Sequence, residues 1–139
     1  MTATEFATHF REGVDRFNTL RFWDAHESWE ELWLEAETEL DQFLQGLIQL
    51  AAAYHHLRRG TFGGGVRLFD AALRRLEAFP LRHCGVDRGE AVRIAPLHRR
   101  RAEEALSAGS KTPFLRDDEY PKLQLLSAAE SPMPPSDPW

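Results

Sequence analysis

The sequence has little cysteine, no long apolar run and no surplus of positive charge, and each absence excludes a class of protein. Cys84 is the only cysteine among 139 residues, which excludes an intrachain disulfide and a cysteine-based metal cluster. No apolar stretch approaches the roughly 20 residues that a membrane span needs. The N-terminus lacks the charged segment and the following apolar segment that mark a signal peptide. We therefore expect a cytoplasmic protein that does not bind membranes.

The charge balance argues against a nucleic-acid partner. The chain has 17 Lys and Arg residues against 22 Asp and Glu residues, for a formal net charge of -5. Proteins that bind nucleic acids usually carry a basic surplus. The one basic run, at 99–101, precedes Glu103 and Glu104 in a helical pattern, which is typical of a solvated helix face. We expect no nucleic-acid partner.

The chain is rich in aromatic residues, and its apolar residues repeat at helical spacing. Four tryptophans and nine phenylalanines favour a packed core, and the length suits one domain. Periodicity and capping signals predict five helices, over about 4–17, 21–37, 39–59, 61–79 and 87–106. Thr4 is the predicted cap of the first helix, and Asp87 with Glu90 that of the fifth. Pro96 should kink or split the fifth helix. No hairpin signals are present, so no strand pairs are predicted.

The pattern predicts an all-α fold, a compact bundle of about five helices with an irregular, proline-rich C-terminal extension. The third helix is apolar around most of its circumference, which is typical of a central helix. We expect a helical domain over residues 1–109. An extended segment over 110–130 should pack on it at Phe114, Leu115 and Leu125. A disordered tail should follow over 131–139, where four of nine residues are proline.

The second predicted helix places charged and aromatic side chains on one face. On a helical wheel His26, Trp29 and Glu30 lie within about 80° of one another, together with the aromatic residues at 22 and 33. A carboxylate is normally excluded from a core-facing stripe unless it is paired or bound to a metal. The pair of His26 and Glu30 therefore indicates a site.

A divalent metal ion is one explanation of this pair. His26 and Glu30 are four residues apart, so both side chains can reach one ion, and His/carboxylate ligation suits Zn, Mn or Fe. A third ligand is required, and His56 is the candidate if the second and third helices pack antiparallel. Gln45, Gln49 and Trp29 would then surround the ligands or contact a bound small molecule. Glu30 stands where zincins have a second histidine.

A structural network is the other explanation. His26, Glu30, Gln45 and Gln49 could hydrogen-bond one another between two helices and fix their register without a ligand. The protein would then be a non-enzymatic interaction module, and the aromatic surplus would contribute to a homodimer or partner interface.

Two stretches in the right order resemble a known family. The sequence FWDAHESWEELW at 22–33 and the sequence FLQGLIQLAAAYHH at 43–56 resemble the bacterial and archaeal domain of unknown function 309, over roughly 6–79. The resemblance implies a small all-α domain. The family has been labelled a predicted metal-dependent hydrolase, in which His26, Glu30 and His56 would hold the ion. The matching motif residues are His26, Glu27, Glu30, Gln45, Gln49 and His56.

Within this resemblance Glu27 is the candidate catalytic base for a hydrolase acting on an unidentified small ligand. The helical wheel, however, places Glu27 outside the core-facing stripe. Either Glu27 faces a cleft between the first and second helices, or the ideal wheel is inaccurate near a helix start.

Overall fold

The computed structural model describes residues 2–36 and 38–126, so the predicted tail at 131–139 lies outside the described residues. Five helices dominate the fold, which confirms the predicted all-α class. Their bounds are α1 Ala3–Asn18, α2 Phe22–Trp33, α3 Thr38–Arg59, α4 Phe62–Leu76 and α5 Gly89–Ser107. Among these described helices none is long and apolar enough to cross a membrane.

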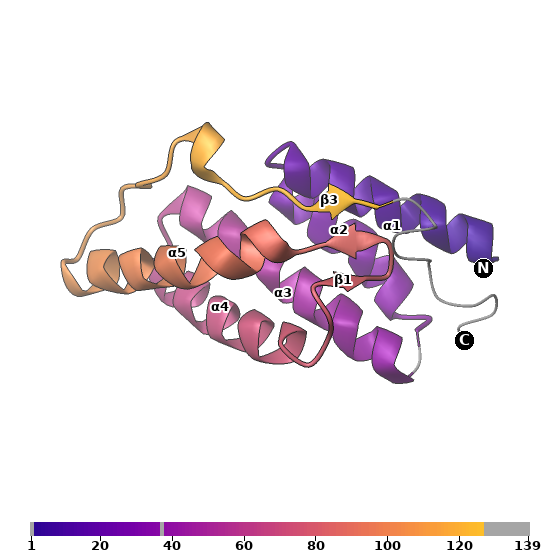
Figure 1. Cartoon of the computed structure of the whole chain (residues 1–139). Helices are drawn as coiled ribbons and strands as arrows, with labels where there is room; N and C mark the ends of the chain where they lie inside the picture. The colour runs from indigo at the N-terminus through magenta and orange to yellow at the C-terminus, as the bar shows by residue number, and fades with distance from the viewer. Residues whose placement is uncertain (1, 37, 127–139) are drawn as a thin grey trace.

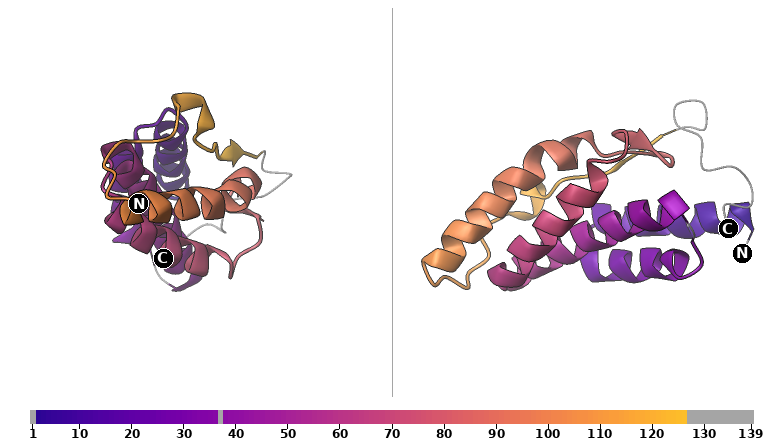
Figure 2. Two further views of the ribbon diagram at one scale, coloured as in Figure 1. Left: turned by 90° about the vertical axis from the view of Figure 1, so that its left-hand side faces the viewer. Right: turned by 90° about the horizontal axis from the view of Figure 1, so that it is seen from below.

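Each helix packs mainly against its neighbours in sequence. Figure 1 shows α3 in the middle of the bundle, between α2 and α4, and α5 lying against α4. The other views in Figure 2 show α4 and α5 extending away from the end where α1 begins. The fully buried side chains of α3 include Phe43, Leu47, Ala51 and Tyr54. The predicted central position of the third helix is thus confirmed.

The cap of α1 lies two residues earlier than predicted. Thr2, and not Thr4, caps the helix: its hydroxyl accepts a hydrogen bond from the Glu5 amide at 3.0 Å. The Glu5 carboxylate in turn accepts from the Thr2 amide at 3.1 Å, which completes a capping box. The glutamate three residues further on selects Thr2, because only that spacing satisfies both amides.

The predicted capping box of α5 does not form. Asp87 accepts a hydrogen bond from the Gly89 amide at 2.8 Å, close to the helix start. Glu90 instead accepts from the Lys122 amide at 2.8 Å and thereby binds the C-terminal segment. Pro96 does not split α5, which continues from 89 to 107. Pro96 lies at the surface, where water can bond the carbonyl that the proline leaves without a donor.

A small antiparallel sheet corrects the prediction of no strand pairs. Its strands are β1 Arg82–His83, β2 Val86–Asp87 and β3 Gln124–Leu125, in the order β1-β2-β3. The β1–β2 turn consists of Cys84 and Gly85, with φ of 53° and 79°, the conformation that suits a two-residue hairpin. Strands of two residues are too short to show an alternating pattern of apolar and polar residues, so no strand could be recognised from periodicity.

The segment after α5 forms a strap, here defined as residues 110–126, that returns along the bundle to pair β3 with β2 (Figure 1). Phe114 and Leu115 pack partly buried against the core, as predicted. Leu125 is 46% exposed and does not pack on the core, whereas Tyr120, Leu123 and Leu126 of the strap are buried. The strap is also held by Asn18 of α1, whose side chain makes two 2.8 Å hydrogen bonds to the Leu123 backbone.

A buried histidine makes the stability of the fold depend on pH. His98 of α5 is 4% exposed, and its Nδ1 lies 2.8 Å from the Tyr54 hydroxyl of α3. Burial, assisted by the charge of Arg101, lowers the pKa of His98 to about 4. Below the unfolded pKa of about 6.5 the unfolded chain therefore binds a proton that the folded protein does not. Stability should fall as the pH drops from about 6.5 to about 4, and this contribution should then level off.

We expect His98 alone to lower the free energy of unfolding by about 1 kcal/mol between pH 7.5 and pH 5.5. Urea unfolding at both pH values should show this loss in the parent and a smaller loss in His98→Gln, which cannot titrate. The matched control is His9→Gln, which makes the same substitution at a half-buried position on α1. An equal pH dependence in the parent and His98→Gln would refute the prediction.

Candidate functional site

The structure brings His26 and Glu30 together on α2. The Nε2 atom of His26 lies 3.2 Å from Oε2 of Glu30, and the two side chains are 17% and 48% exposed. The helical spacing of four residues produces this contact. The pair therefore lies at the edge of the core, with its carboxylate facing solvent.

An indole ring continues this pair toward α3. The ring of Trp23 stacks on that of His26, with centroids 4.6 Å apart and planes 17° apart. The same indole also contacts the ring of His55 near the end of α3, at 5.1 Å. The start of α2 thus meets the end of α3, as the predicted antiparallel packing requires. Trp23 is nevertheless 48% exposed, whereas Trp29 is fully buried in the core and donates its indole N–H to the Phe10 carbonyl.

The two histidines of α3 complete the arrangement. The rings of His55 and His56 lie 5.9 Å apart, and Nδ1 of His56 is 2.6 Å from the Thr61 hydroxyl oxygen. Burial is the main cause that lowers the pKa of both histidines, and the charge of Arg59 lowers each further. Both rings are therefore neutral at pH 7. We call the continuous series Glu30, His26, Trp23, His55, His56 and Thr61 the imidazole–indole row.

His56 lies at the end of the row that is opposite to His26 and Glu30. Its described contacts are with His55 and Thr61, and a Cβ atom on Gly64 of α4 would come within 3.1 Å of its ring. The close approach of α4 thus fixes the ring at this end, while His26 and Glu30 are at the other. Of the three predicted metal ligands, the described contacts join His26 and Glu30 only.

The remaining predicted residues lie elsewhere. The Gln49 side-chain oxygen accepts a hydrogen bond from Arg75 Nε of α4 at 3.1 Å, so Gln49 faces α4. Gln45 is half-buried on α3. Glu27 lines a separate cavity of about 320 Å³ between α1 and α2, which agrees with the predicted cleft between these helices. Ser28 is buried beside this cavity, because Arg16 of α1 packs over it and donates a hydrogen bond to its hydroxyl.

The row contains histidine and carboxylate side chains, which are the kinds of group that bind metal ions. In the described part of the chain, no three His, Cys, Asp or Glu side chains are grouped so that they could hold one. Nδ1 of His26 is buried, without a hydrogen-bond partner among the described residues. A metal on Nε2 would move the ring proton to Nδ1, where metal-binding histidines normally donate to an acceptor. The residues as arranged do not fit a resident metal ion, and the metal ligands stay a prediction.

The part of the chain that contains the row is similar to a known protein family. Residues 10–68 match the family described as "Domain of unknown function (DUF309)". We call this stretch, which is less than half of the chain, the DUF309 segment. The DUF309 segment runs from α1 into α4 and contains the complete imidazole–indole row. Its description assigns no activity, and no curated protein matches the chain.

Three residues of the imidazole–indole row, Trp23, His55 and Thr61, are not among the predicted site residues. The tryptophans are predicted to contribute to a packed core, and His56, not His55, is the predicted ligand on the third helix. One signal was present in the sequence, because Trp23 and His26 are three residues apart and such pairs meet on a helix. The contact between Trp23 and His55 depends on how α2 packs on α3, which periodicity does not specify.

Proposed function

We propose that this protein is a binding module that takes a small organic cation at the imidazole–indole row. The observation that carries the proposal is the position of Trp23: a rigidly held indole, half exposed, beside a half-exposed carboxylate. Cations are attracted to the faces of tryptophan rings, and such contacts are common in the recognition of ammonium ligands.

The ring of Trp23 is already ordered before a ligand arrives. His26 stacks on it from the same helix, and His55 contacts it from α3. A side chain fixed in this way loses little conformational entropy on binding. Leaving 48% of a tryptophan in water also forfeits hydrophobic stabilisation that the other described tryptophans obtain. This combination is typical of a binding surface.

Glu30 supplies the negative charge of the proposed site. The buried Nδ1 of His26 has no described acceptor, so the favoured tautomer carries its proton on Nε2 and donates it to Glu30. A carboxylate that accepts one hydrogen bond from a neutral ring keeps its charge and further acceptor positions. Glu30 can therefore pair with a cationic group that lies against Trp23.

The proposal favours binding over hydrolysis. Glu27, the predicted base, lines the cavity between α1 and α2 and has no described contact with the row. A general base must come within hydrogen-bonding distance of the group it deprotonates. The hydrolase prediction therefore gains no support from the position of Glu27.

Benzamidine is a suitable probe because it is planar and cationic at neutral pH, and neutral benzamide has nearly the same shape. We expect benzamidine to shift the Trp23 indole resonance in NMR titrations, and benzamide to have little effect. Trp23→Leu should weaken binding roughly threefold to thirtyfold, and Glu30→Gln by a similar factor. Glu31→Gln removes the same charge from the same helix and should leave the affinity within about twofold.

Three outcomes would overturn the proposal. Benzamide could bind as well as benzamidine, or Glu31→Gln could weaken binding as much as Glu30→Gln. Elemental analysis of tag-free protein could also find near-stoichiometric metal that His26→Ala and Glu30→Ala both lose, which would establish the metal site instead. Concentration-dependent sedimentation that Trp23→Leu abolishes, without any benzamidine response, would favour the dimerisation module.

A further inference from the structure

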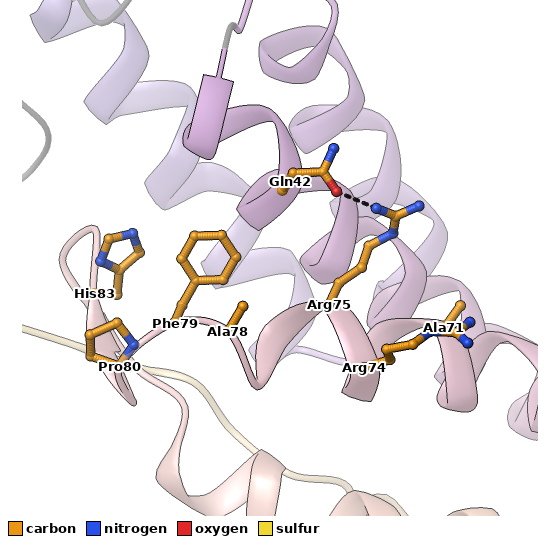
Figure 3. Close-up of a pocket in the computed structure, with 8 residues that line it drawn as sticks. All are labelled: Gln42, Ala71, Arg74, Arg75, Ala78, Phe79, Pro80 and His83. Atoms are coloured by element: carbon orange, nitrogen blue, oxygen red, sulfur yellow. Dashed lines mark hydrogen bonds between the residues drawn. The ribbon is translucent and has the colours of Figure 1, made fainter.

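A second cavity, of about 720 Å³, lies between α3, the end of α4 and β1, and its chemistry differs from that of the row. Figure 3 shows Phe79, Pro80 and His83 on one side and Arg74 and Arg75 on the other, with Gln42 between them. Among the described residues that line it, none is acidic. The volume is in the range of small-molecule sites, and most of the lining lies beyond the DUF309 segment.

Arg75 is oriented by neutral groups. Its Nε donates to the Gln49 side-chain oxygen at 3.1 Å, and a terminal guanidinium nitrogen donates to the Gln42 side-chain oxygen. Both acceptors are amides, which position the guanidinium without cancelling its charge, as a carboxylate would. Within the described chain neither Arg75 nor Arg74 forms an ion pair. The contrast is Arg99 of α5, which pairs with Asp70 and Glu103.

Arg75 does not bind the free carbonyl groups at the end of its helix, because Arg88 binds them instead. Arginines there usually bind the free carbonyl groups of the helix end. At the end of α4 Arg88 does this, through hydrogen bonds of 2.8 to 3.3 Å to the carbonyls of Leu76, Phe79 and Pro80. Arg75 instead points toward the glutamines of α3. Its charge faces the cavity and has no described structural counter-charge.

The opposite side of the cavity is flat and largely apolar. The rings of Phe79 and His83 stack at 5.2 Å with planes 30° apart, and Pro80 continues this surface. Such a wall suits the face of an aromatic ring. A ligand that fills the cavity would therefore meet an aromatic wall at one end and two guanidinium groups at the other.

We infer that this cavity binds a small phosphomonoester with an aromatic body. Two guanidinium groups carry a charge that matches the dianion of a phosphomonoester, and the guanidinium fork fits phosphate oxygens. A carboxylate supplies only one negative charge. This inference concerns a different site from the imidazole–indole row and does not depend on it.

Phenyl phosphate is the probe, with benzoate and phenol as the monoanionic and uncharged comparisons. Calorimetry and NMR should show phenyl phosphate binding, with shifts at Phe79 and His83, and weaker binding of benzoate and phenol. Arg75→Gln should weaken phenyl phosphate binding roughly 10- to 100-fold. Arg67→Gln makes the same charge change at an exposed position of α4 outside the cavity, and should change the affinity less than about twofold.

Gln42→Ala adds a second variant, because it leaves the charge unchanged and removes one group that orients Arg75. Its affinity should fall between those of the parent and Arg75→Gln, with an unchanged melting temperature. Equal losses in Arg67→Gln and Arg75→Gln would show a non-specific charge effect and overturn the inference. It would also be overturned if benzoate bound as tightly as phenyl phosphate, or if no probe bound to folded parent protein.

Discussion

Replacing Arg88 with methionine should lower the free energy of unfolding by about 3 kcal/mol or more. Arg88 is 1% exposed, and its guanidinium lies 5.1 Å over the Phe43 ring. It donates to the carbonyls of Leu76, the last residue of α4, and of Phe79 and Pro80 just after the helix. Methionine has a similar length but no donors. The Phe79 and Pro80 carbonyls would lose the hydrogen bonds that Arg88 donates, and the Leu76 carbonyl would keep only the 3.1 Å bond from the Phe79 amide. Each such group costs about 1–3 kcal/mol.

Thermal and urea unfolding would measure this effect, and the melting temperature should fall by roughly 10 °C. Arg93→Met is the matched control, because Arg93 is an exposed arginine on α5 and its loss should change the stability by less than about 0.5 kcal/mol. Arg88→Lys should be intermediate, since one ammonium group cannot reach all three carbonyls. If Arg88→Met melted within about 2 °C of the parent, the carbonyls of α4 would not depend on this residue.

Gly13→Ala should destabilise the protein by roughly 2–4 kcal/mol, although alanine is the better helix former. A Cβ atom at position 13 of α1 would lie 2.1 Å from Nε1 of Trp29 on α2. Trp29 is fully buried, and its Nε1 donates to the Phe10 carbonyl at 3.2 Å. The new methyl group would displace the indole and break this hydrogen bond. That loss exceeds the gain of about 1 kcal/mol from helix propensity.

The control is the same substitution where the helix surface is open. At Gly63 of α4 the nearest atom to a new Cβ would be a terminal nitrogen of Arg67, at 3.7 Å. Gly63→Ala should therefore keep or raise the stability, by up to about 1 kcal/mol. Chemical denaturation of both variants would give the comparison. Similar stability changes in the two variants would mean that α1 can move away from α2 at little cost.

The helices could be predicted from the sequence because each buries one continuous stripe. Phe6, Phe10, Val14 and Phe17 of α1 illustrate this, since all four are buried as their spacing predicts. The sheet could not be predicted for two reasons: the β1–β2 hairpin is local but its strands have only two residues each, and the β2–β3 pair joins segments that are far apart in the sequence. The register of β2 with β3 depends on the position of the strap, and no local pattern specifies that position.

In the candidate sites, too, contacts within one helix could be predicted from the sequence and contacts between helices could not. The contact of His26 with Glu30 lies within one helix turn, so spacing was sufficient to predict it. The contact of Trp23 with His55 joins two helices and required their packing. The orientation of the Gln49 side chain also depends on how helices pack, because its hydrogen-bond donor, Arg75, lies in the next helix.

The strap has a consequence for the order in which the protein assembles. The hydrogen bonds between Asn18 and Leu123 join residues 105 positions apart, whereas each helix packs mainly on the next one along the chain. Closing a long loop costs more entropy than closing a short one, and local contacts form faster. The helices can therefore associate while the strap is still loose. Until the strap docks, part of the surface of α1 and the free edge of β2 remain open. Unpaired strand edges can pair with other chains, so the protein is most prone to aggregate before the strap is in place.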